Sequence, residues 1–493
     1  MCLSFAFLAP IILLVFYPTL ANLKISLALA AVAIFIFVFF SKKYSSYLEL
    51  KFTLTHFAIV GLSAALLLIV DNVKAYLAFE LNGIDFSIYD HALFNTTNGP
   101  FMWSNLCNCN HFAVHPNWIL LGLIPLHELI SSPWFLVILQ PLIIVSSLIP
   151  LYLLTKSYIA TPTLKLVFLV AFIANPWVGS INGYGFHVEA FYLPIGFWLL
   201  WAWISQRNIS LFLFLLLFLS IKEDAAFYML GFSFYGFLFK QRKKISASIF
   251  LISLGVFIIN QFVVMPAIRP AEWQPSFVSF WGHYGNDLES IALTMLKSPW
   301  LVLKDILSSQ WYLLFASALF LPFFSGHAFA AMLPAMIILG TSLNPNMRAY
   351  GLYYSAPLLP FFFWGFLQAL PKLTKKLGEK KSASIFLAAC TLLLFTRNGS
   401  IKLDVPRLEI YKDLRLILEE QKEFSGTICS QLSLVPHLPY HWDIRALSDE
   451  CLKIPGAKRL GHLDLVTYPY NKNSLKPLLL DLKKRDSGIL TDF

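Results

Sequence analysis

Two short stretches hold most of the residues that could do chemistry, and both follow an apolar run. In residues 82–95, NGIDFSIYDHALFN, the side chains of Asp85, Asp90 and His91 stand among few other charges. In residues 107–116, CNCNHFAVHP, two cysteines and two histidines lie close together. Acidic residues near a membrane interior are costly and often functional, so both aspartates are candidate site residues. The alternative is that a long loop simply needs polar residues.

The Cys/His stretch has the residue types of a metal site but not the usual spacing. Its pattern is C-x-C-x-H-x₃-H, whereas structural zinc sites use C-x₂₋₄-C with a distant second pair. A disulfide joining Cys107 or Cys109 to another part of the chain is an equal alternative. We also consider His111 or His115 as ligands of a catalytic divalent ion that a nearby carboxylate completes.

Further charged residues stand at the ends of apolar runs. His187 and Glu189 begin one run, and Lys222, Glu223 and Asp224 separate two others. We predict substrate contacts for the first two and for the lysine, and the two acids of the turn are further candidate site residues. A carboxylate in a first helical turn and a charged turn between helices also occur without any function.

A later stretch, NPNMRAYGLYYSAPLLPF, places an arginine and several tyrosines before another apolar run. Arg348 is the only lysine or arginine in residues 327–371. An arginine beside an apolar wall suits a lipid phosphate, and Tyr354 could contact the same substrate. The alternatives are an arginine that snorkels to the interface and an ordinary aromatic belt.

The composition is that of a membrane protein. Hydrophobic residues make up 58% of the chain and charged residues 13%, compared with about 25% charged in soluble domains. The apolar residues form blocks separated by short polar segments. Since a helix needs roughly 20 apolar residues to cross the hydrocarbon, the sequence predicts an all-α polytopic membrane protein.

The net charge of +10 does not indicate nucleic acid. Much of the excess lies in short basic clusters between apolar blocks, at 41–51, 240–244 and 375–381. Such clusters are typical of cytoplasmic loops. The first apolar run lacks the basic start and the cleavage site of a signal peptide, so we interpret it as an uncleaved span. We expect an inner-membrane protein with a cytoplasmic N-terminus and an extracytoplasmic C-terminus.

About thirteen transmembrane helices would place all three basic clusters on the cytoplasmic side of the membrane. We predict them at 3–21, 24–40, 53–70, 134–155, 163–176, 188–204, 209–221, 225–240, 245–265, 310–324, 327–343, 353–371 and 383–396. Two shorter apolar segments, 117–130 and 299–307, are predicted to be amphipathic helices lying at the outer interface.

These spans divide the chain into three parts. Residues 1–50 form a peripheral N-terminal pair, and 51–396 form the main transmembrane domain, whose outer loop 71–133 carries the candidate site. Residues 397–493 are more polar and are predicted to fold as a small extracytoplasmic α/β domain. Within it, Cys429 and Cys451 could form a disulfide in an oxidising compartment.

The order of these features resembles that of the GT-C membrane glycosyltransferases. Asp85 follows a span, Gly99 comes fourteen residues later, and His115-Pro116 leads into the apolar segment 117–130. The closest branch is the protein O-mannosyltransferase and aminoarabinose transferase group. The chain is more similar still to an uncharacterised multi-pass family of bacteria and archaea, a domain of unknown function. That similarity lies in GIDFSIYDHALFNTTNG, HFAVHPNWILLGLIPL, GFHVEAFYLP, IKEDAAF and YYSAPLLPF, over roughly residues 75–370.

The resemblance to GT-C enzymes implies a role for each candidate residue. It makes Asp85 the base that activates the acceptor, with Asp90 as its competitor, while polyprenyl phosphate leaves. It makes Glu223 and Asp224 helpers for a metal or the acceptor, and Arg348 a contact of the donor phosphate. The chain departs from the transferase pattern at IDFS, where those enzymes commonly have a second acid directly after the aspartate.

The predicted function is therefore transfer of a sugar from a polyprenyl-phosphate-linked donor to an extracytoplasmic acceptor. Its partners are membrane lipid, that donor and the acceptor; a divalent metal ion is the one cofactor considered, and nucleic acid is not a partner. No nucleotide-binding motif is present, so the donor must arrive already energised. The alternatives are a transporter or flippase of a lipid-linked or small polar substrate, and a scaffold whose C-terminal domain binds a partner.

Overall fold

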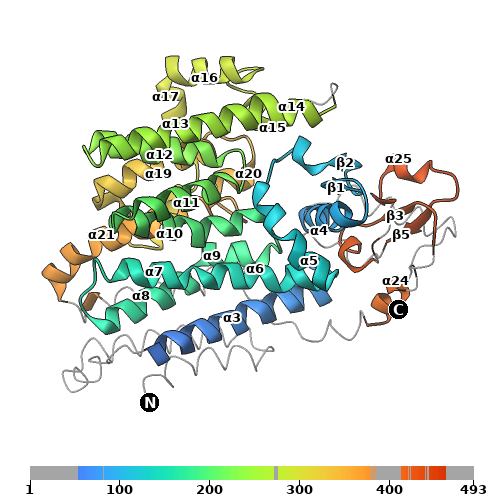
Figure 1. The fold of residues 1–493 in the computed structure, drawn as a ribbon, viewed down its shortest axis with the longest axis horizontal. Helices are drawn as coiled ribbons and strands as arrows, with labels where there is room; N and C mark the ends of the chain where they lie inside the picture. The colour runs from blue at the N-terminus through green and yellow to red at the C-terminus, as the bar shows by residue number, and fades with distance from the viewer. Residues whose placement is uncertain are drawn as a thin grey trace.

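The computed structural model describes residues 54–81, 83–270, 276–378, 381–382, 412–419, 421, 424–438, 440 and 443–461. The described chain is mostly helical, and its long helices run roughly side by side (Figure 1). The predicted spans at 3–21, 24–40 and 383–396 lie outside the described residues.

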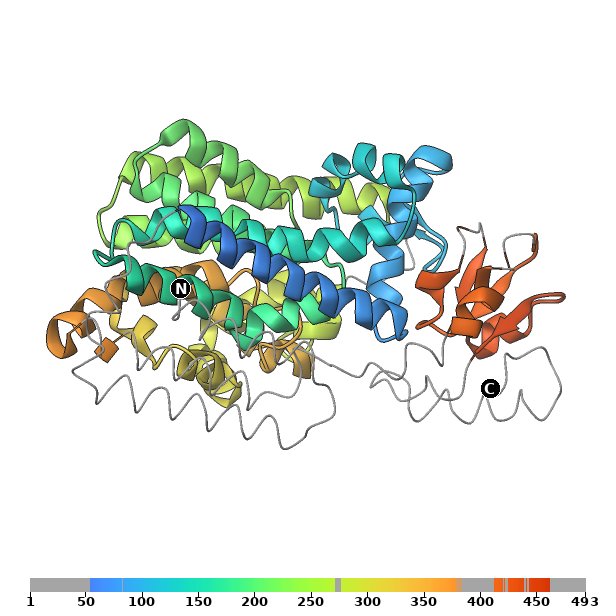
Figure 2. The same ribbon diagram turned by 90° about the horizontal axis from the view of Figure 1, so that it is seen from below.

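One layer of the helical bundle is built from the first three apolar runs among the described residues. It contains α3 (Leu54–Leu77), α6 (Trp134–Ser146) with α7 (Leu148–Thr155), and α8 (Pro162–Ala174) with α9 (Pro176–Gly183). Helix α3 runs across the face seen in Figure 2. The predicted span 163–176 extends to Gly183 in the structure. It is broken into α8 and α9, which meet at an angle of 43°. Pro176 cannot continue the preceding helix, and the Asn175 side chain caps the new one at the Trp177 amide.

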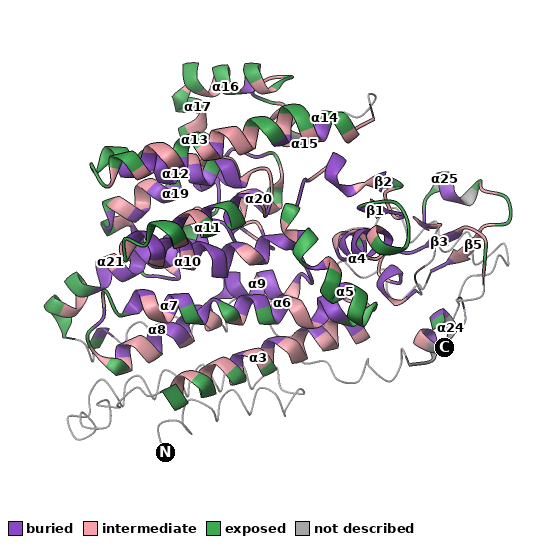
Figure 3. Ribbon diagram, in the orientation of Figure 1, coloured by how far each residue is buried: buried purple, intermediate pink, exposed green. Residues whose placement is uncertain are grey.

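The remaining long helices complete the bundle. They are α10 (Tyr192–Ile204) after the short turn η4 (Val188–Phe191), α11 (Asn208–Leu219), α12 (Ala225–Leu238), α13 (Lys243–Ile259) with η5 (Asn260–Val264) and α14 (Met265–Ile268), α19 (Gly326–Gly340) and α21 (Leu359–Leu377). Helices α15 (Ser276–Trp281), α16 (Leu288–Lys297) and α17 (Pro299–Ser308) lie outside them. Figure 3 shows much of α16 and α17 exposed, and the predicted segment 299–307 corresponds to α17.

Three of the described helical segments are long and apolar enough to cross a membrane, and the bent pair α8–α9 makes a fourth. The other apolar helices are shorter, and a helix of twelve residues such as α11 rises only about 18 Å against the roughly 30 Å of hydrocarbon. The described residues support a membrane protein with several apolar helices, and the number of thirteen spans is not confirmed.

Two predicted spans differ clearly from the structure. Residues 310–324 form α18 (Trp311–Ala316) and the turn η6 (Leu321–Phe324), because Leu319 and Phe320 adopt left-handed backbone angles that end the helix. The predicted span 353–371 becomes helical only at Leu359. Left-handed residues at Tyr350 and Leu352 keep the preceding segment, which includes the short α20 (Pro345–Arg348), in turns.

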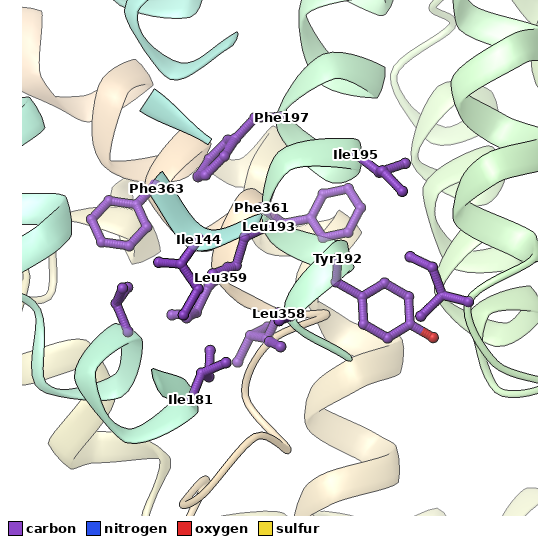
Figure 4. Packing of buried hydrophobic residues seen from close by; sticks show 14 of the residues in the cluster. Ile144, Ile181, Tyr192, Leu193, Ile195, Phe197, Leu358, Leu359, Phe361 and Phe363 are labelled. Atoms are coloured by element: carbon purple, nitrogen blue, oxygen red, sulfur yellow. The ribbon is translucent and has the colours of Figure 1, made fainter. Parts of the chain in front are cut away.

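Aromatic and branched side chains fill the centre of the bundle. Figure 4 shows Tyr192, Leu193 and Phe197 of α10 packed among Phe361 and Phe363 of α21, all nearly fully buried. Helices α10 and α21 approach closely at Gly196, where an added Cβ would lie 2.6 Å from the Pro360 ring. This contact holds α10 against α21, and the start of α10 follows directly after Glu189 of η4.

The loop predicted to carry the site is folded against one end of the bundle (Figure 1). It contains α4 (Gly83–Asn98), the hairpin β1 (Trp103–Ser104) and β2 (Cys109–Asn110), η2 (His111–Ala113), η3 (Trp118–Gly122) and α5 (Ile124–Ile130). The amphipathic helix predicted at 117–130 is two short helices, with Pro125 in the first turn of the second. Leu126, Leu129 and Ile130 expose an apolar face on α5, as a helix lying at an interface would.

The described part of residues 397–493 packs next to that loop. It has a parallel sheet in the order β4 (Ile444–Ala446), β3 (Ile428–Ser430) and β5 (Lys458–Leu460), with α24 (Lys412–Glu419), η8 (Val435–His437) and α25 (Asp449–Leu452). Cys429 and Cys451 form a disulfide between β3 and α25. Gly83 of α4 lies so close to this unit that an added Cβ would be 1.7 Å from the Leu432 carbonyl oxygen.

Candidate functional site

A buried ion pair joins the start of α10 to the turn between α11 and α12. The Lys222 ammonium lies 2.8 Å from Glu189 Oε1, and their side chains are 12% and 4% exposed. Burial by itself lowers the pKa of Lys222, but the carboxylates of Glu189, Asp224 and Glu223 outweigh burial and raise that pKa above its usual value. Lys222 is therefore charged and compensates several acids at once.

The same turn holds a histidine of the loop. His115 Nδ1 lies 2.8 Å from Glu223 Oε1. The position of His115 is fixed because Asn117 donates from Nδ2 to the Ile221 carbonyl at 2.6 Å and the Ile119 amide donates to the Ser220 carbonyl at 2.9 Å. Burial would raise the pKa of Glu223, but the adjacent His115 holds it below its usual value.

Two tyrosines hold the second acid of the turn. Tyr192 and Tyr228 each donate a hydrogen bond of 2.9 Å to Asp224, one to each carboxylate oxygen. Burial raises the pKa of Asp224, and the Glu223 and Glu189 carboxylates raise it further against the effect of Lys222. The two acids are thus placed differently: Glu223 is ionised beside a histidine, and Asp224 is the more basic carboxylate.

These charged groups line one end of a cavity of about 340 Å3. The polar end is formed by side chains from the loop, from η4, from the turn and from the end of α14: His115, Glu189, Lys222, Glu223, Asp224 and Arg269. The rest of the wall is apolar and aromatic and includes Phe227, Phe257, Met265, Phe280, Trp281 and Met295. The cavity therefore suits a ligand with a charged head and a hydrocarbon tail.

Arg269 is the cation of this cavity that the sequence analysis did not single out. It lines the cavity, and its Nε donates to the Ala113 carbonyl at 3.1 Å. Its position directly after a long apolar run was the available signal. Arg348, the predicted phosphate contact, instead donates from Nη2 to Ser308 Oγ at 2.5 Å and is not among the residues that line the cavity. Tyr354 does line it.

Asp85, the predicted base, lies beside this cavity but does not line it. It occupies the first turn of α4, accepts a hydrogen bond of 2.5 Å from the Tyr184 hydroxyl, and has its Oδ2 3.9 Å from His187 Nε2. The Tyr353 ring stacks on His187 with ring centres 3.6 Å apart and also lines the cavity. Asp85 is thus connected to the cavity wall through His187 and Tyr353.

His187 links the two regions through a chain of polar contacts. Its Nε2 lies 3.3 Å from the Tyr89 hydroxyl, and its Nδ1 faces the Glu189 carboxylate in a close ion pair. The backbone amide of His187 donates to Gln140 Oε1 at 3.2 Å. The predicted substrate residues His187 and Glu189 are therefore brought together, but only Glu189 reaches the cavity wall.

Asp90 is placed away from Asp85 and from the cavity. Its Oδ1 lies 3.0 Å from His127 Nε2 of α5 and accepts a hydrogen bond of 2.9 Å from the Tyr440 hydroxyl. Tyr440 also stacks on Phe94 with ring centres 4.0 Å apart. Asp90 therefore ties the loop to the C-terminal unit, a contact across 350 residues for which the sequence carries no local signal.

The residues predicted to bind metal are engaged with protein groups. His111 Nε2 lies 2.5 Å from Asn117 Oδ1, and burial together with the neighbouring His115 lowers the pKa of His111 to about 4. Cys107 and Cys109 are joined to each other by a disulfide, so the alternative pairing elsewhere in the chain is wrong. Among the described residues, no group of three or more His, Cys, Asp or Glu side chains is arranged to hold a metal ion. A divalent ion at His111, His115, Glu223 and Asp224 stays a prediction.

Long apolar helices with charged side chains gathered at their ends define a helical membrane protein. Residues 75–401 match the model of a family described as predicted membrane protein, DUF2079. Because the match covers more than half of the chain, the protein belongs to this family of predicted membrane proteins. No match was found among curated proteins.

Proposed function

We propose that this protein is an integral membrane glycosyltransferase that moves a sugar from a polyprenyl-phosphate carrier to an extracytoplasmic acceptor. The observation that carries the proposal is the amphiphilic cavity, with its charged end at Lys222 and Arg269 and its apolar walls from α13, α14, α15, α16 and α19. The charged end would hold the phosphate and the sugar. The apolar walls would hold the start of the prenyl chain, whose remainder lies in the bilayer.

The charges at the polar end fit such a donor. Lys222 is already paired with Glu189, so it would contribute a nearby positive charge that offsets the charge of the phosphate. Arg269 lines the cavity, and its planar guanidinium group suits a phosphate oxygen. We therefore assign the phosphate contact to Arg269 in place of Arg348.

The resemblance to GT-C enzymes and the disulfides support the reaction class and its side of the membrane. Both disulfides lie in the units that pack together at one end of the bundle, Cys107–Cys109 in the loop and Cys429–Cys451 in the C-terminal unit. Disulfides persist in oxidising compartments, whereas basic clusters such as 240–244 favour the cytoplasmic side. An extracytoplasmic site with a lipid-linked donor is consistent with both.

The test compares two arginine variants in donor binding. We expect Arg269→Ala to weaken binding of nerylneryl phosphate to the purified full chain by about 10-fold to 100-fold, since hydrogen bonds to charged groups contribute about 1.5–3 kcal/mol. Arg348→Ala is the matched control and is expected to change affinity by less than about twofold, because its guanidinium contacts Ser308 outside the cavity. Equal affinities of the natural protein and the Arg269 variant would contradict the proposal.

A transporter or flippase is the second candidate, and the bend between α8 and α9 favours it. Broken helices are typical of transporter substrate sites. In vesicles that contain the protein, a fluorescent prenyl phosphate would then move between leaflets faster than in empty vesicles, as measured by dithionite quenching. No acceleration, together with sugar transfer, would favour the transferase.

A further inference from the structure

The cavity contains a histidine that is oriented for acid–base chemistry. Within the described residues, four histidines lie within 4 Å of a carboxylate oxygen: His115, His127, His187 and His283. His127 and His187 are almost fully buried, and His283 pairs with Asp305 outside the cavity. His115 alone of these four lines the cavity, with its side chain 25% exposed.

The geometry fixes which nitrogen is available. His115 Nδ1 lies 2.8 Å from Glu223 Oε1, so with an ionised Glu223 this nitrogen carries the proton and donates it in a hydrogen bond. The other nitrogen, Nε2, then carries the lone pair. A carboxylate that orients an imidazole through Nδ1–H is the arrangement that makes Nε2 a competent base. The Asn117 side chain and the Ile119 backbone amide both donate to carbonyls of the turn at 220–221, and these contacts hold the pair in register.

We propose that His115 is the general base that activates the acceptor, that Glu223 is its positioning residue, and that the acceptor is a hydroxyl group. This inference rests on the proposed function. His115 Nε2 takes the proton of the hydroxyl as its oxygen forms a bond to the anomeric carbon. The bond between that carbon and the phosphate oxygen breaks, and its electron pair leaves with the polyprenyl phosphate. Arg269 and Lys222 lie at the same end of the cavity and balance the charge of the departing phosphate.

The geometry favours His115 over the aspartate that the resemblance suggests. Asp85 does not line the cavity, whereas His115 lines it together with both cations. An amine acceptor that is protonated at neutral pH would also need a base, but only to remove its proton before the attack. A hydroxyl loses its proton while its oxygen attacks, so the base must stay beside it throughout the attack. For this reason the position of the imidazole points to a hydroxyl acceptor.

The test uses the full-length protein in liposomes with a panel of nerylneryl-phosphate hexoses and pentoses, and octyl glucoside as the hydroxyl acceptor. We expect His115→Asn to lower kcat by about 100-fold to 10,000-fold with the KM for the donor changed by less than about threefold. Glu223→Gln is expected to keep more activity and to shift the rising limb of the pH–rate profile to lower pH, because the imidazole loses its carboxylate neighbour. A merely structural role would not move that limb.

His283→Asn is the matched control, since His283 also pairs with a carboxylate and is 30% exposed. It is expected to leave both rate and pH profile unchanged. If the natural protein consumes none of the donors, the proposed function fails, and the inference falls with it. If the natural protein is active and His115→Asn keeps its rate, or Asp85→Asn loses more than His115→Asn, the proposed function stands and the assignment of His115 is overturned.

Discussion

Replacing Lys222 with methionine removes the cation on which several buried carboxylates depend. The ammonium lies 2.8 Å from Glu189 Oε1, with side-chain exposures of 12% and 4%, and Glu223 and Asp224 also raise its pKa. Methionine keeps much of the length and the apolar stem of lysine, so the loss reports mainly the charge. Removing one partner of a buried ion pair typically costs about 3–5 kcal/mol, because the remaining charge is left uncompensated.

For a chain of this length, such a loss corresponds to a fall of roughly 3–5 °C in the melting temperature. The assay is thermal unfolding of the purified full chain in one detergent, followed by intrinsic tryptophan fluorescence. Lys156→Met is the matched control: Lys156 is exposed and its ammonium lies 4.7 Å from the Tyr152 ring centre, so a change of only about 0.5 kcal/mol is expected.

A second substitution tests whether the uncompensated acid is the cause. The double variant Glu189→Gln with Lys222→Met removes the carboxylate that lost its partner, and it is expected to be more stable than Lys222→Met alone. Equal losses for the Lys222 and Lys156 variants would refute the reasoning, and so would a double variant whose losses simply add.

Two further predictions concern the loop. Gly83→Ala places a Cβ 1.7 Å from the Leu432 carbonyl oxygen and is expected to loosen the C-terminal unit, so limited proteolysis should release that unit faster. Gly122→Ala is the control: Gly122 has open space around it, and the rate of proteolysis should not change. Burial lowers the folded-state pKa of His111 from 6.5 to about 4. Between these values only the unfolded chain binds the proton, so stability falls as pH decreases through this window by up to about 3 kcal/mol. His111→Gln should flatten the fall in a pH series of melting curves; an unchanged slope would contradict this assignment.

The long apolar runs were sufficient to predict the helices that cross the bundle. Helices α3, α6 with α7, and α13 with α14 lie where continuous hydrophobicity predicts them, because length and apolarity are properties of the local sequence. The runs at 310–324 and 353–371 misled the prediction. Left-handed backbone at Phe320 interrupts the first run, and the helix of the second begins only at Leu359, after left-handed residues at Tyr350 and Leu352; hydropathy carries no information about such turns.

The sequence indicated several charged residues that line the cavity, but it did not indicate which of them contact one another. Glu189, Lys222 and Glu223 could be chosen because charges at the ends of apolar runs are conspicuous, but which of them meet depends on the packing of α10 against α11 and α12. Arg269 was missed because the contact that places it, with the Ala113 carbonyl, joins residues 156 positions apart. Sequence spacing predicts contacts within one helix. The charged residues of the cavity instead come from four different parts of the chain: the loop, η4, the turn and the end of α14.

Asp85 and Asp90, the two candidates for the base in the sequence analysis, have separate contacts in the structure. Five residues apart on α4, Asp85 and Asp90 point about 140° away from each other around the helix axis. Asp85 accordingly meets Tyr184 and faces His187 of the bundle, while Asp90 meets Tyr440 of the C-terminal unit. Helix α4 therefore connects the C-terminal unit to the part of the bundle that lies beside the cavity. Because Asp85 does not line the cavity, the base is best sought first among the side chains that do.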